Sequence, residues 1–220
     1  LHLGLAGGDA GELTAAACLG GVPHPPGYPL YVILGHLFCE LPFRTPAWRV
    51  NLFSAFCGAG SVALLFVALA QGAKERLVAV ACALTFAFLP LVWEHATHAE
   101  VFALNHFLLS ATLLATVKRK PWVTCFLAGL SLSNQYASLF LVLPLAVFSL
   151  MNVKGPRWRL WVTSGFVFLA GLTPYLILPL LQSFNPIQWS WGDLSTVRGF
   201  FVHVLRREYG TFNLTAAGAR

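Results

Sequence analysis

Charged side chains are scarce in this sequence. Asp, Glu, Lys and Arg make up only 10% of the 220 residues, whereas 57% are hydrophobic, and the mean hydropathy is +0.71. This composition is too apolar for a soluble domain of this size and predicts an all-α polytopic membrane protein. The net charge of +6 does not indicate nucleic-acid binding, because most basic residues stand in short clusters between apolar runs, as topogenic signals do.

Methionine is scarce, and closely spaced cysteine pairs are absent from the sequence. The sequence has a single methionine and does not begin with it, so we expect the chain to start partway through a larger protein, with any upstream signal or span absent. The five cysteines form no CxxC pair, and Cys57, Cys82 and Cys125 fall inside apolar runs, which favours small buried hydrophobes. For Cys18 and Cys39, a disulfide formed in an oxidising lumen is the less favoured alternative.

Long apolar runs between charged clusters predict membrane spans. Residues 28–41 are too short to cross a bilayer core, which needs about 20 helical residues, and predict an interfacial or re-entrant helix. The predicted spans are 51–71, 77–93, 101–117 and 160–182, the last broken or kinked at Pro174 and Pro179. Residues 121–151 exceed one crossing and are interrupted by polar residues at 131–138, which fits two short spans or a re-entrant pair.

The basic clusters set the sidedness of these spans. Residues 118–120 and 154–159 should both face the cytoplasm, so an even number of crossings separates them. We divide the chain into a luminal loop with an interfacial helix (1–50), transmembrane helices (51–182) and a luminal loop with an amphipathic helix (183–220). Seven of the eight acids then fall on the luminal side: Asp9, Glu12, Glu40, Glu94, Glu100, Asp193 and Glu208.

Residues 7–29 gather two carboxylates, a histidine, six glycines and four prolines, and are the first candidate for chemistry. Asp9 and Glu12 stand three apart, so a helix entered at Asp9 would point both carboxylates to one face. A capping box, with Asp9 as N-cap and Glu12 at the third helical position, is an equally weighted and compatible alternative. The HPPGYP motif at 24–29 predicts a rigid, non-helical path, in which His24 either contacts a phosphate or acceptor or is only structural.

Two further polar segments hold candidate residues. His95, His98 and Glu100 are of metal-ligand type, but a polar loop at the membrane face is favoured over a metal site. Placing the Glu100 carboxylate beside an apolar run costs enough free energy to suggest that it has a function. Asp193 can hydrogen-bond a polar ligand, although the tryptophans before it favour an aromatic belt at the interface.

The C-terminal segment predicts an amphipathic helix on the membrane over 196–208. Arg206 and Arg207 either hold a lipid phosphate by bidentate contacts or anchor the helix to headgroups. Asn213 begins an N-glycosylation acceptor tripeptide, which agrees with a luminal tail. The predicted apolar face consists of Val197, Phe200, Phe201, Val204 and Leu205.

Seven motifs in order resemble one known family, the transmembrane protein O-mannosyltransferases that modify IPT domains of plexins and related receptors. The resemblance runs nearly end to end, with one departure at Ala10, where the family pattern has a serine. The motifs are GGDAGEL (7–13), HPPGYPL (24–30), RVNL (49–52), AEVFALN (99–105), GLSLSNQ (129–135), WGD (191–193) and EYGTF (208–212).

The resemblance implies the N-terminal part of a GT-C type transmembrane domain in the endoplasmic reticulum membrane. It implies transfer of mannose from dolichyl phosphate mannose to Ser or Thr of a receptor IPT domain, with inversion and no cofactor. Asp9 would be the general base and Glu12 would orient the acceptor or Asp9. His24, Glu100 and Asp193 would contact sugar or phosphate, and Arg206 and Arg207 the phosphate. It also implies a span before residue 1 and further spans and a soluble region after residue 220.

Two other classes stay open on the sequence. A transporter or lipid flippase would line its path with intramembrane polar residues such as Glu100, Asn134 and Gln135, but no inverted repeat supports it. A transporter should also carry acids at mid-membrane, whereas most acids here fall in the predicted luminal loops. The third reading is a non-catalytic scaffold subunit.

Overall fold

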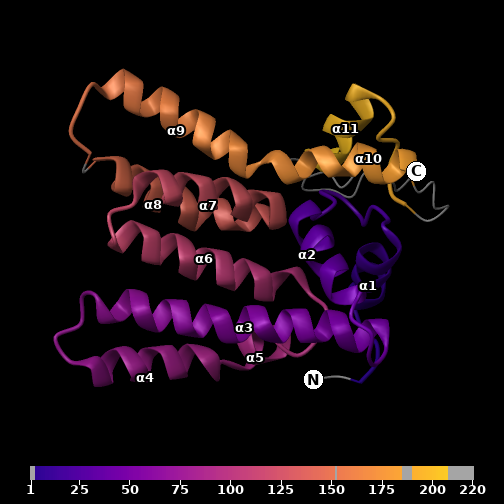
Figure 1. The fold of residues 1–220 in the computed structure, drawn as a ribbon, viewed down its shortest axis with the longest axis horizontal. Helices are drawn as coiled ribbons and strands as arrows, with labels where there is room; N and C mark the ends of the chain where they lie inside the picture. The colour runs from indigo at the N-terminus through magenta and orange to yellow at the C-terminus, as the bar shows by residue number, and fades with distance from the viewer. Residues whose placement is uncertain (1–2, 152, 185–189, 208–220) are drawn as a thin grey trace, which may run out of the picture.

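The computed structural model describes residues 3–151, 153–184 and 190–207, and within these ranges every regular element is helical (Figure 1). The elements are α1 (Ala10–Leu19), α2 (Pro29–Cys39), α3 (Pro46–Ala70), α4 (Arg76–Ala87), α5 (Pro90–His95), α6 (Val101–Val117), α7 (Pro121–Asn134), η1 (Tyr136–Ser138), α8 (Leu139–Met151), α9 (Arg157–Gly171), η2 (Thr173–Leu176), α10 (Ile177–Phe184) and α11 (Val197–Val204).

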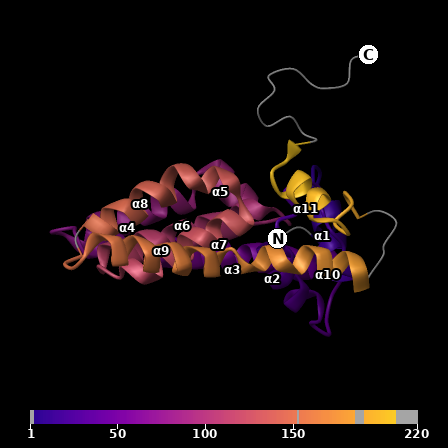
Figure 2. The same cartoon turned by 90° about the horizontal axis from the view of Figure 1, so that it is seen from above.

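Six helices form an elongated bundle, and four more gather at one end of it. Helices α3, α4, α6, α7, α8 and α9 lie side by side, while α1, α2, α10 and α11 cluster at the end opposite the α3–α4 turn (Figures 1 and 2). The largest core cluster joins the two groups, because it combines Leu13 of α1 and Tyr31 of α2 with Phe53 of α3 and Leu104 of α6. The short helices are therefore packed onto the bundle.

Proline decides where several helices begin. Pro46, Pro90 and Pro121 each occupy the first turn of a helix, where the missing N–H costs nothing. The predicted span 77–93 is wrong as a single helix, because Pro90 interrupts it. Pro90 holds Leu89 at ψ 128°, outside the helical region, and the segment divides into α4 and α5.

Other predicted boundaries agree with the structure. The predicted helix 101–117 coincides with α6. The expected break inside 121–151 is present, since α7 ends at Asn134 and η1 precedes α8. The expected kink in 160–182 is also present: α9 and the η2–α10 segment meet at 45° at Leu172, just before Pro174. The part of the prediction that named Pro179 is wrong, because Pro179 lies inside α10.

Helix length gives limited support for membrane crossing. Within the described ranges, α3 is long and apolar enough to cross a bilayer, and α9 with η2–α10 makes a second candidate if the bent pair counts as one span. The other apolar helices are shorter, between 10 and 17 residues. The predicted number of spans is therefore not confirmed.

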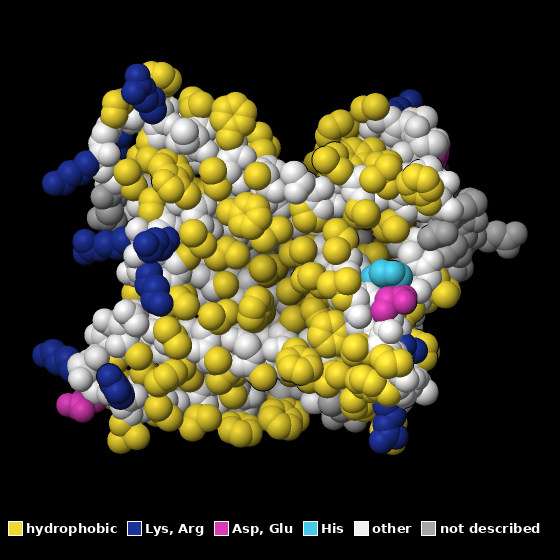
Figure 3. Space-filling view, viewed as in Figure 1, with side chains coloured by type: hydrophobic (Ala, Val, Ile, Leu, Met, Phe, Trp, Pro, Cys, Tyr) yellow, Lys and Arg dark blue, Asp and Glu magenta, His cyan; other side chains and the backbone are white. Residues whose placement is uncertain are grey.

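Basic side chains are concentrated at one end of the bundle, although charges of both signs are present at both ends (Figure 3). Lysine and arginine side chains collect over the turns that join α3 to α4, α6 to α7 and α8 to α9; we call this the basic end. The other end carries α1 with its two carboxylates, and we call it the acidic end. The residues of the basic end are Lys74, Arg76, Lys118, Arg119, Lys120, Lys154, Arg157 and Arg159.

The amphipathic helix differs from the prediction. Helix α11 covers Val197–Val204, and the predicted apolar face is divided between two environments. Phe200 and Val204 pack against a buried cluster that includes Leu178 of α10, whereas Val197 and Phe201 are exposed. The expectation of one membrane-facing stripe is therefore wrong, because two of its five residues, Phe200 and Val204, pack against the buried cluster around Leu178.

Candidate functional site

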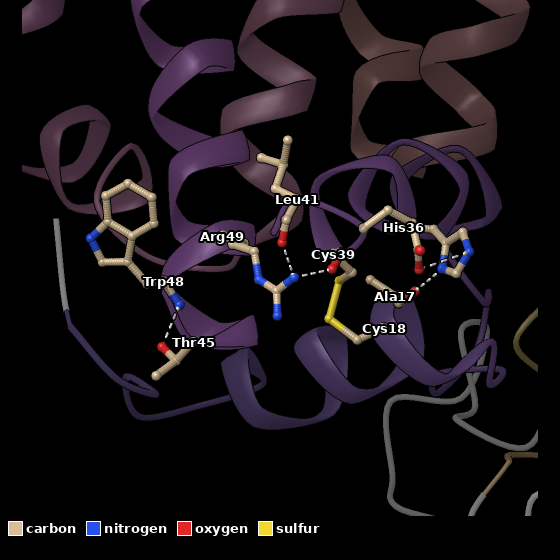
Figure 4. The surroundings of a disulfide bond; sticks show 9 residues. Ala17, Cys18, His36, Cys39, Leu41, Thr45, Trp48 and Arg49 are labelled. Carbon is tan, nitrogen blue, oxygen red and sulfur yellow. Dashed lines mark hydrogen bonds and ion pairs between the residues drawn. A yellow bond between two sulfur atoms is a disulfide. The ribbon is translucent and has the colours of Figure 1, made fainter. Parts of the chain in front are cut away.

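Helix α1 is covalently fixed to α2. Cys18 and Cys39 form a disulfide, which corrects the expectation that these cysteines stay unpaired (Figure 4). The Nδ1 atom of His36 adds a contact of 2.8 Å to the carbonyl oxygen of Ala17, and the Arg49 guanidinium donates to the carbonyls of Cys39 and Leu41. These links hold the helix that carries Asp9 and Glu12 against the bundle.

The segment between α1 and α2 is buried. Residues 20–32 have little exposed surface, and the backbone of Val22 is fixed on both sides, since its N–H donates to Ser190 Oγ at 3.1 Å and its carbonyl accepts from the Trp191 N–H at 3.0 Å. The HPPGYP motif therefore follows the rigid, non-helical path that the sequence predicted, between α1 and the segment beginning at residue 190.

Both carboxylate oxygens of Glu12 contact His24. Its Oε1 accepts from the His24 backbone N–H at 2.6 Å, and its Oε2 lies 2.9 Å from His24 Nδ1. The other ring nitrogen of His24, Nε2, lies 3.0 Å from the Tyr28 hydroxyl. The capping box is not formed, because Asp9 is the N-cap of α1 without a side-chain capping bond and Glu12 reaches forward in the chain. A carboxylate, an imidazole and a phenol thus form one connected chain.

The pKa shifts of these side chains favour an ionised Glu12–His24 pair. Partial burial alone would raise the pKa of Glu12, but the hydrogen bonds from His24 outweigh it and lower that pKa. The same side-chain hydrogen bond raises the pKa of His24, with the charges of Glu12 and Asp9 adding to it against burial and Arg206. Burial raises the pKa of the Tyr28 hydroxyl to about 12, so Tyr28 stays a hydrogen-bonding group.

Asp9 and Glu100 complete the acidic cluster. Asp9 Oδ2 lies 3.8 Å from His24 Nε2, and its side chain is 58% exposed, so the carboxylate is open to a ligand. Glu100 lies close by, since a Cβ on Gly8 would be 3.7 Å from its Oε1. Burial and the charge of Asp9 raise the pKa of Glu100 to about 7. We call Asp9, Glu12, His24, Tyr28 and Glu100 the Asp9 site.

Arg206 belongs to the same region. Its charge opposes protonation of His24 and favours ionisation of Tyr28, so it acts on both residues. The C-terminal end of α11 is tied down there by the Tyr136 hydroxyl, which donates to the Val204 carbonyl. Arg207 is exposed. Of the residues that the family resemblance assigned to one site, the structure brings Asp9, Glu12, His24, Glu100 and Arg206 together, whereas Asp193 and Arg207 are exposed.

The remaining candidate residues lie elsewhere or cannot be placed. Asp193 is exposed and turns toward its own loop, accepting from the Ser195 N–H and hydroxyl at Oδ1. Asn213 lies outside the described residues. The sequence analysis missed Tyr28, although it stands in the HPPGYP motif, and His203, which lies in the segment predicted to be an amphipathic helix on the membrane.

One cluster in the described part of the chain has the spacing of a metal site. The ligand atoms of Asp9, Glu12 and His24 all lie within 4.8 Å of one another. A divalent cation could use these groups only if Glu12 gave up part of its pairing with His24, because that pairing occupies the carboxylate. His95 and His98 are in ring contact, with centroids 6.4 Å apart, rather than in that cluster.

The fold and the site define an all-helical, largely apolar protein with a carboxylate–histidine site at one end of a helical bundle. The chain belongs to the family described as the protein O-mannosyl-transferase TMEM260 N-terminal domain, whose family model matches residues 9–159. That match includes all five residues of the Asp9 site and ends before α11.

Two curated relatives are similar over 96% of the chain. One is the protein O-mannosyl-transferase TMEM260 of Mus musculus, 37% identical over 225 aligned residues, and the other is the protein O-mannosyl-transferase tmem260 of Dictyostelium discoideum, 33% identical over 237. The aligned parts are 32% and 29% of those relatives, so the chain spans about a third of their length. No solved structure matches the chain significantly.

Proposed function

We propose that this chain provides the acceptor-activating site of a protein O-mannosyltransferase. In the proposed reaction, mannose passes from dolichyl phosphate mannose to a Ser or Thr hydroxyl of a receptor IPT domain in the lumen of the endoplasmic reticulum. The names of the curated relatives support O-mannosyl transfer. The lipid donor, the IPT acceptor and the GT-C class follow from the family resemblance of the motifs.

One observation carries the proposal: the exposed carboxylate of Asp9 lies beside a Glu12–His24 pair whose side chains are hydrogen-bonded to each other. Glu12 is held by two contacts to His24, whereas Asp9 is exposed. A general base must reach the substrate hydroxyl, so the exposed Asp9 is the base and takes the acceptor proton. The acceptor oxygen then attacks the sugar carbon as the bond to the dolichyl phosphate breaks, which inverts the configuration at that carbon.

The structure changes the role we assign to Glu12. The sequence left it to orient the acceptor or Asp9, but both of its carboxylate oxygens contact His24, and the Trp191 side chain is a further hydrogen-bond partner. We therefore assign Glu12 to positioning His24 and keeping it charged, so that the imidazolium faces Asp9 and the incoming donor. Arg206, which acts on the same histidine, is the residue we assign to the leaving phosphate.

The membrane setting is part of the proposal. Large apolar side chains are exposed on outer helices, among them Leu77 of α4, Phe140 of α8 and Phe166 of α9, as expected of lipid-facing helices. The basic end would face the cytoplasm and the acidic end the lumen. The Cys18–Cys39 disulfide supports an oxidising compartment on the acidic side, and Asn213 would be a luminal glycosylation acceptor.

A test of the base uses the full-length protein with Asp9→Asn, which keeps the size of the side chain and removes its charge. Mannosylation of a purified IPT domain is measured with a dolichyl phosphate mannose donor. We expect a loss of about 100-fold to 10,000-fold in turnover, the usual contribution of a general base. Glu75→Gln, an exposed acid of the opposite end, is the matched control. Wild-type turnover in Asp9→Asn at equal expression would remove Asp9 from this role.

The transporter alternative gains no support from the buried amides. Asn134 donates to the Val101 carbonyl at 3.0 Å and Asn51 donates to the Gly4 carbonyl at 3.2 Å, so both join segments of the fold. Glu100 lies in the Asp9 site. Mannose transfer by the purified full-length protein would also exclude a purely scaffolding role.

A further inference from the structure

Trp191 of the WGD motif lies beside the Asp9 site, although it stands far along the chain from α1. The sequence analysis interpreted it as part of an aromatic belt at the membrane interface. Its side chain is 42% exposed, so burial of the ring does not by itself explain where the ring lies. The hydrogen bonds of Trp191 give a more specific explanation, because they connect it to the loop and the helix that form the site.

The backbone of Trp191 is paired with the segment that leads into the HPPGYP motif. The Trp191 N–H donates to the Val22 carbonyl at 3.0 Å, and Ser190 Oγ accepts from the Val22 N–H at 3.1 Å. Val22 is fully buried and stands two residues before His24. The backbone of Trp191 is therefore held beside the loop that carries His24.

The chain is also fixed on the other side of Trp191. Gln182 of α10 donates through Nε2 to the Gly192 carbonyl at 2.8 Å and accepts from the Leu194 N–H. Gly192 has φ +75°, and a Cβ there would lie 2.8 Å from Nδ1 of the buried His203. Helices α10 and α11 therefore hold this loop in place, and the Trp191 side chain extends from a fixed backbone.

The side chain of Trp191 is a hydrogen-bond partner of the Glu12 carboxylate. An indole N–H can only donate and an ionised carboxylate can only accept, so the direction of this bond is unambiguous. Glu12 thus accepts two hydrogen bonds from His24 and a further one from Trp191. Burial would raise the pKa of Glu12, but these bonds together lower it and favour the ionised carboxylate.

The bond from Trp191 has a purpose that the bonds from His24 cannot serve. Both contacts with His24 come from the residue that Glu12 has to orient, and Glu12 extends from α1 on a long side chain that loses rotamer freedom when it is fixed. Trp191 contacts the same carboxylate from a separate segment whose backbone is already held. A third contact of this kind fixes the carboxylate relative to the rest of the site.

We propose that Trp191 is a positioning residue of the Asp9 site, and that its indole N–H holds the Glu12 carboxylate where it directs His24 toward Asp9. The proposal rests on the proposed function, in which Asp9 is the general base and the His24 ring faces it. The loop at 190–194 is then part of the catalytic centre. Because Trp191 acts through Glu12 and His24, kcat should depend on it, whereas the KM for the IPT domain should not.

The first experiment separates the N–H of Trp191 from its ring. Trp191→Phe keeps an aromatic ring without a donor, and Trp191→Gln keeps an N–H donor without the indole. In mannose transfer by the full-length protein to a purified IPT domain, we expect Trp191→Phe to lower kcat about 10-fold to 100-fold at nearly unchanged KM, as misplacement of a catalytic group does. Trp191→Gln should recover part of this loss.

A role in membrane anchoring alone predicts the opposite ranking, because phenylalanine is the better interfacial residue. Wild-type kcat in Trp191→Phe would therefore overturn the proposal. Trp158→Phe is the matched control, at a tryptophan of α9 that is 65% exposed near the basic end, and it should keep the wild-type kcat.

A double-mutant cycle tests whether Trp191 acts through Glu12. The unfolding temperature of the full-length protein is measured for Trp191→Phe, for Glu12→Ala and for the two combined. We expect the combined decrease to be smaller than the sum of the single decreases, because each change removes the same bond. Additive decreases would overturn the proposal. If Trp191→Phe does not fold, Ser190→Ala replaces it in the cycle, since it frees the same loop from the Val22 N–H.

The unfolding cycle requires no mannose transfer, so the two proposals can fail separately. If the cycle shows coupling but the wild-type protein transfers no mannose to an IPT domain, the proposed function fails while Trp191 still positions Glu12. If mannose is transferred but the decreases are additive and Trp191→Phe keeps the wild-type kcat, the positioning role fails alone.

Discussion

Glu12 holds His24 from two directions: Oε1 accepts from the backbone N–H at 2.6 Å, and Oε2 lies 2.9 Å from ring atom Nδ1. The contact fixes both the path of the loop and the orientation of the ring, because Nδ1 then points to the carboxylate. With Nδ1 occupied, Nε2 is left facing the Tyr28 hydroxyl and Asp9. The pair therefore orients the imidazole toward the open carboxylate.

The first prediction concerns the pH dependence of this pair. His24 has a raised pKa, so its contribution to stability is complete below the unfolded value of 6.5 and is lost as pH rises through the folded value. Glu12 has a lowered pKa, so its contribution is complete above 4.5 and is lost as pH falls through the folded value. Glu12→Gln should cost about 1–3 kcal/mol between these limits and less on either side.

Thermal unfolding of wild type and Glu12→Gln across pH 4 to 9 measures this difference. Glu40→Gln is the control, an exposed acid whose contact with His36 is 3.8 Å. A difference between wild type and Glu12→Gln that does not vary with pH would contradict the ionised pair.

The second prediction concerns Glu100. Its pKa is raised to about 7, chiefly by burial, so the folded state binds its proton more tightly than the unfolded state does. Stability should therefore fall as pH rises from about 4.5 to 7, by on the order of 1 kcal/mol after allowing for solvent screening. Glu100→Gln should remove this slope. Unfolding temperatures at pH 5 and pH 8 compare the two proteins, and parallel curves would show that Glu100 is ordinarily ionised.

The third prediction concerns the disulfide. Cys18 and Cys39 are 21 residues apart, so opening their bond should destabilise the fold by about 3 kcal/mol through the gain in chain entropy of the unfolded state. The double variant Cys18→Ser with Cys39→Ser should unfold at lower temperature, and a reductant should shift only the wild type. Cys82→Ser, at an exposed free cysteine, should behave as the wild type. Two alkylatable thiols at 18 and 39 in the folded, unreduced protein would contradict the bond.

The fourth prediction compares two helical glycines. A Cβ on Gly129 of α7 would lie 2.9 Å from the Cα of Gly171 in α9, and close contact of small residues is a common basis of helix packing in membranes. Gly129→Ala should therefore cost about 1–3 kcal/mol. Gly165→Ala, on α9 with open space around it, should be neutral or stabilising by up to about 1 kcal/mol. Thermal unfolding compares them, and equal effects would mean that the two helices can separate freely.

The sequence predicted most helix ends because proline, polar residues and basic clusters mark them locally. Helix α6 and the break after Asn134 follow such marks. The division of 77–93 at Pro90 was missed because mean hydropathy measures transfer to lipid and does not register a missing backbone donor. The docking of α11 was missed because an apolar face looks the same whether lipid or α10 covers it.

The family resemblance named Asp9, Glu12, His24 and Glu100 as site residues, together with Asp193 and Arg207, and it did not name Tyr28. The sequence could not predict that Glu12 pairs with His24, because no local rule gives the path of the loop between them. The Cys18–Cys39 disulfide was only the less favoured alternative, because two cysteines 21 residues apart carry no spacing signal. His203 was missed because only the folded loops bring Gly27 and Gly192 against it.

The last prediction separates the two adjacent arginines. Arg206 is half-buried and acts on His24 and Tyr28, whereas Arg207 is exposed. If Arg206 binds the donor phosphate, Arg206→Gln should raise the KM for dolichyl phosphate mannose at least tenfold, since a charge-assisted contact contributes about 1.5–3 kcal/mol. Arg207→Gln should change KM less, because an exposed charge is screened by solvent. Steady-state kinetics of the full-length protein at two salt concentrations distinguishes them, and equal effects in both variants would indicate general attraction to the membrane surface.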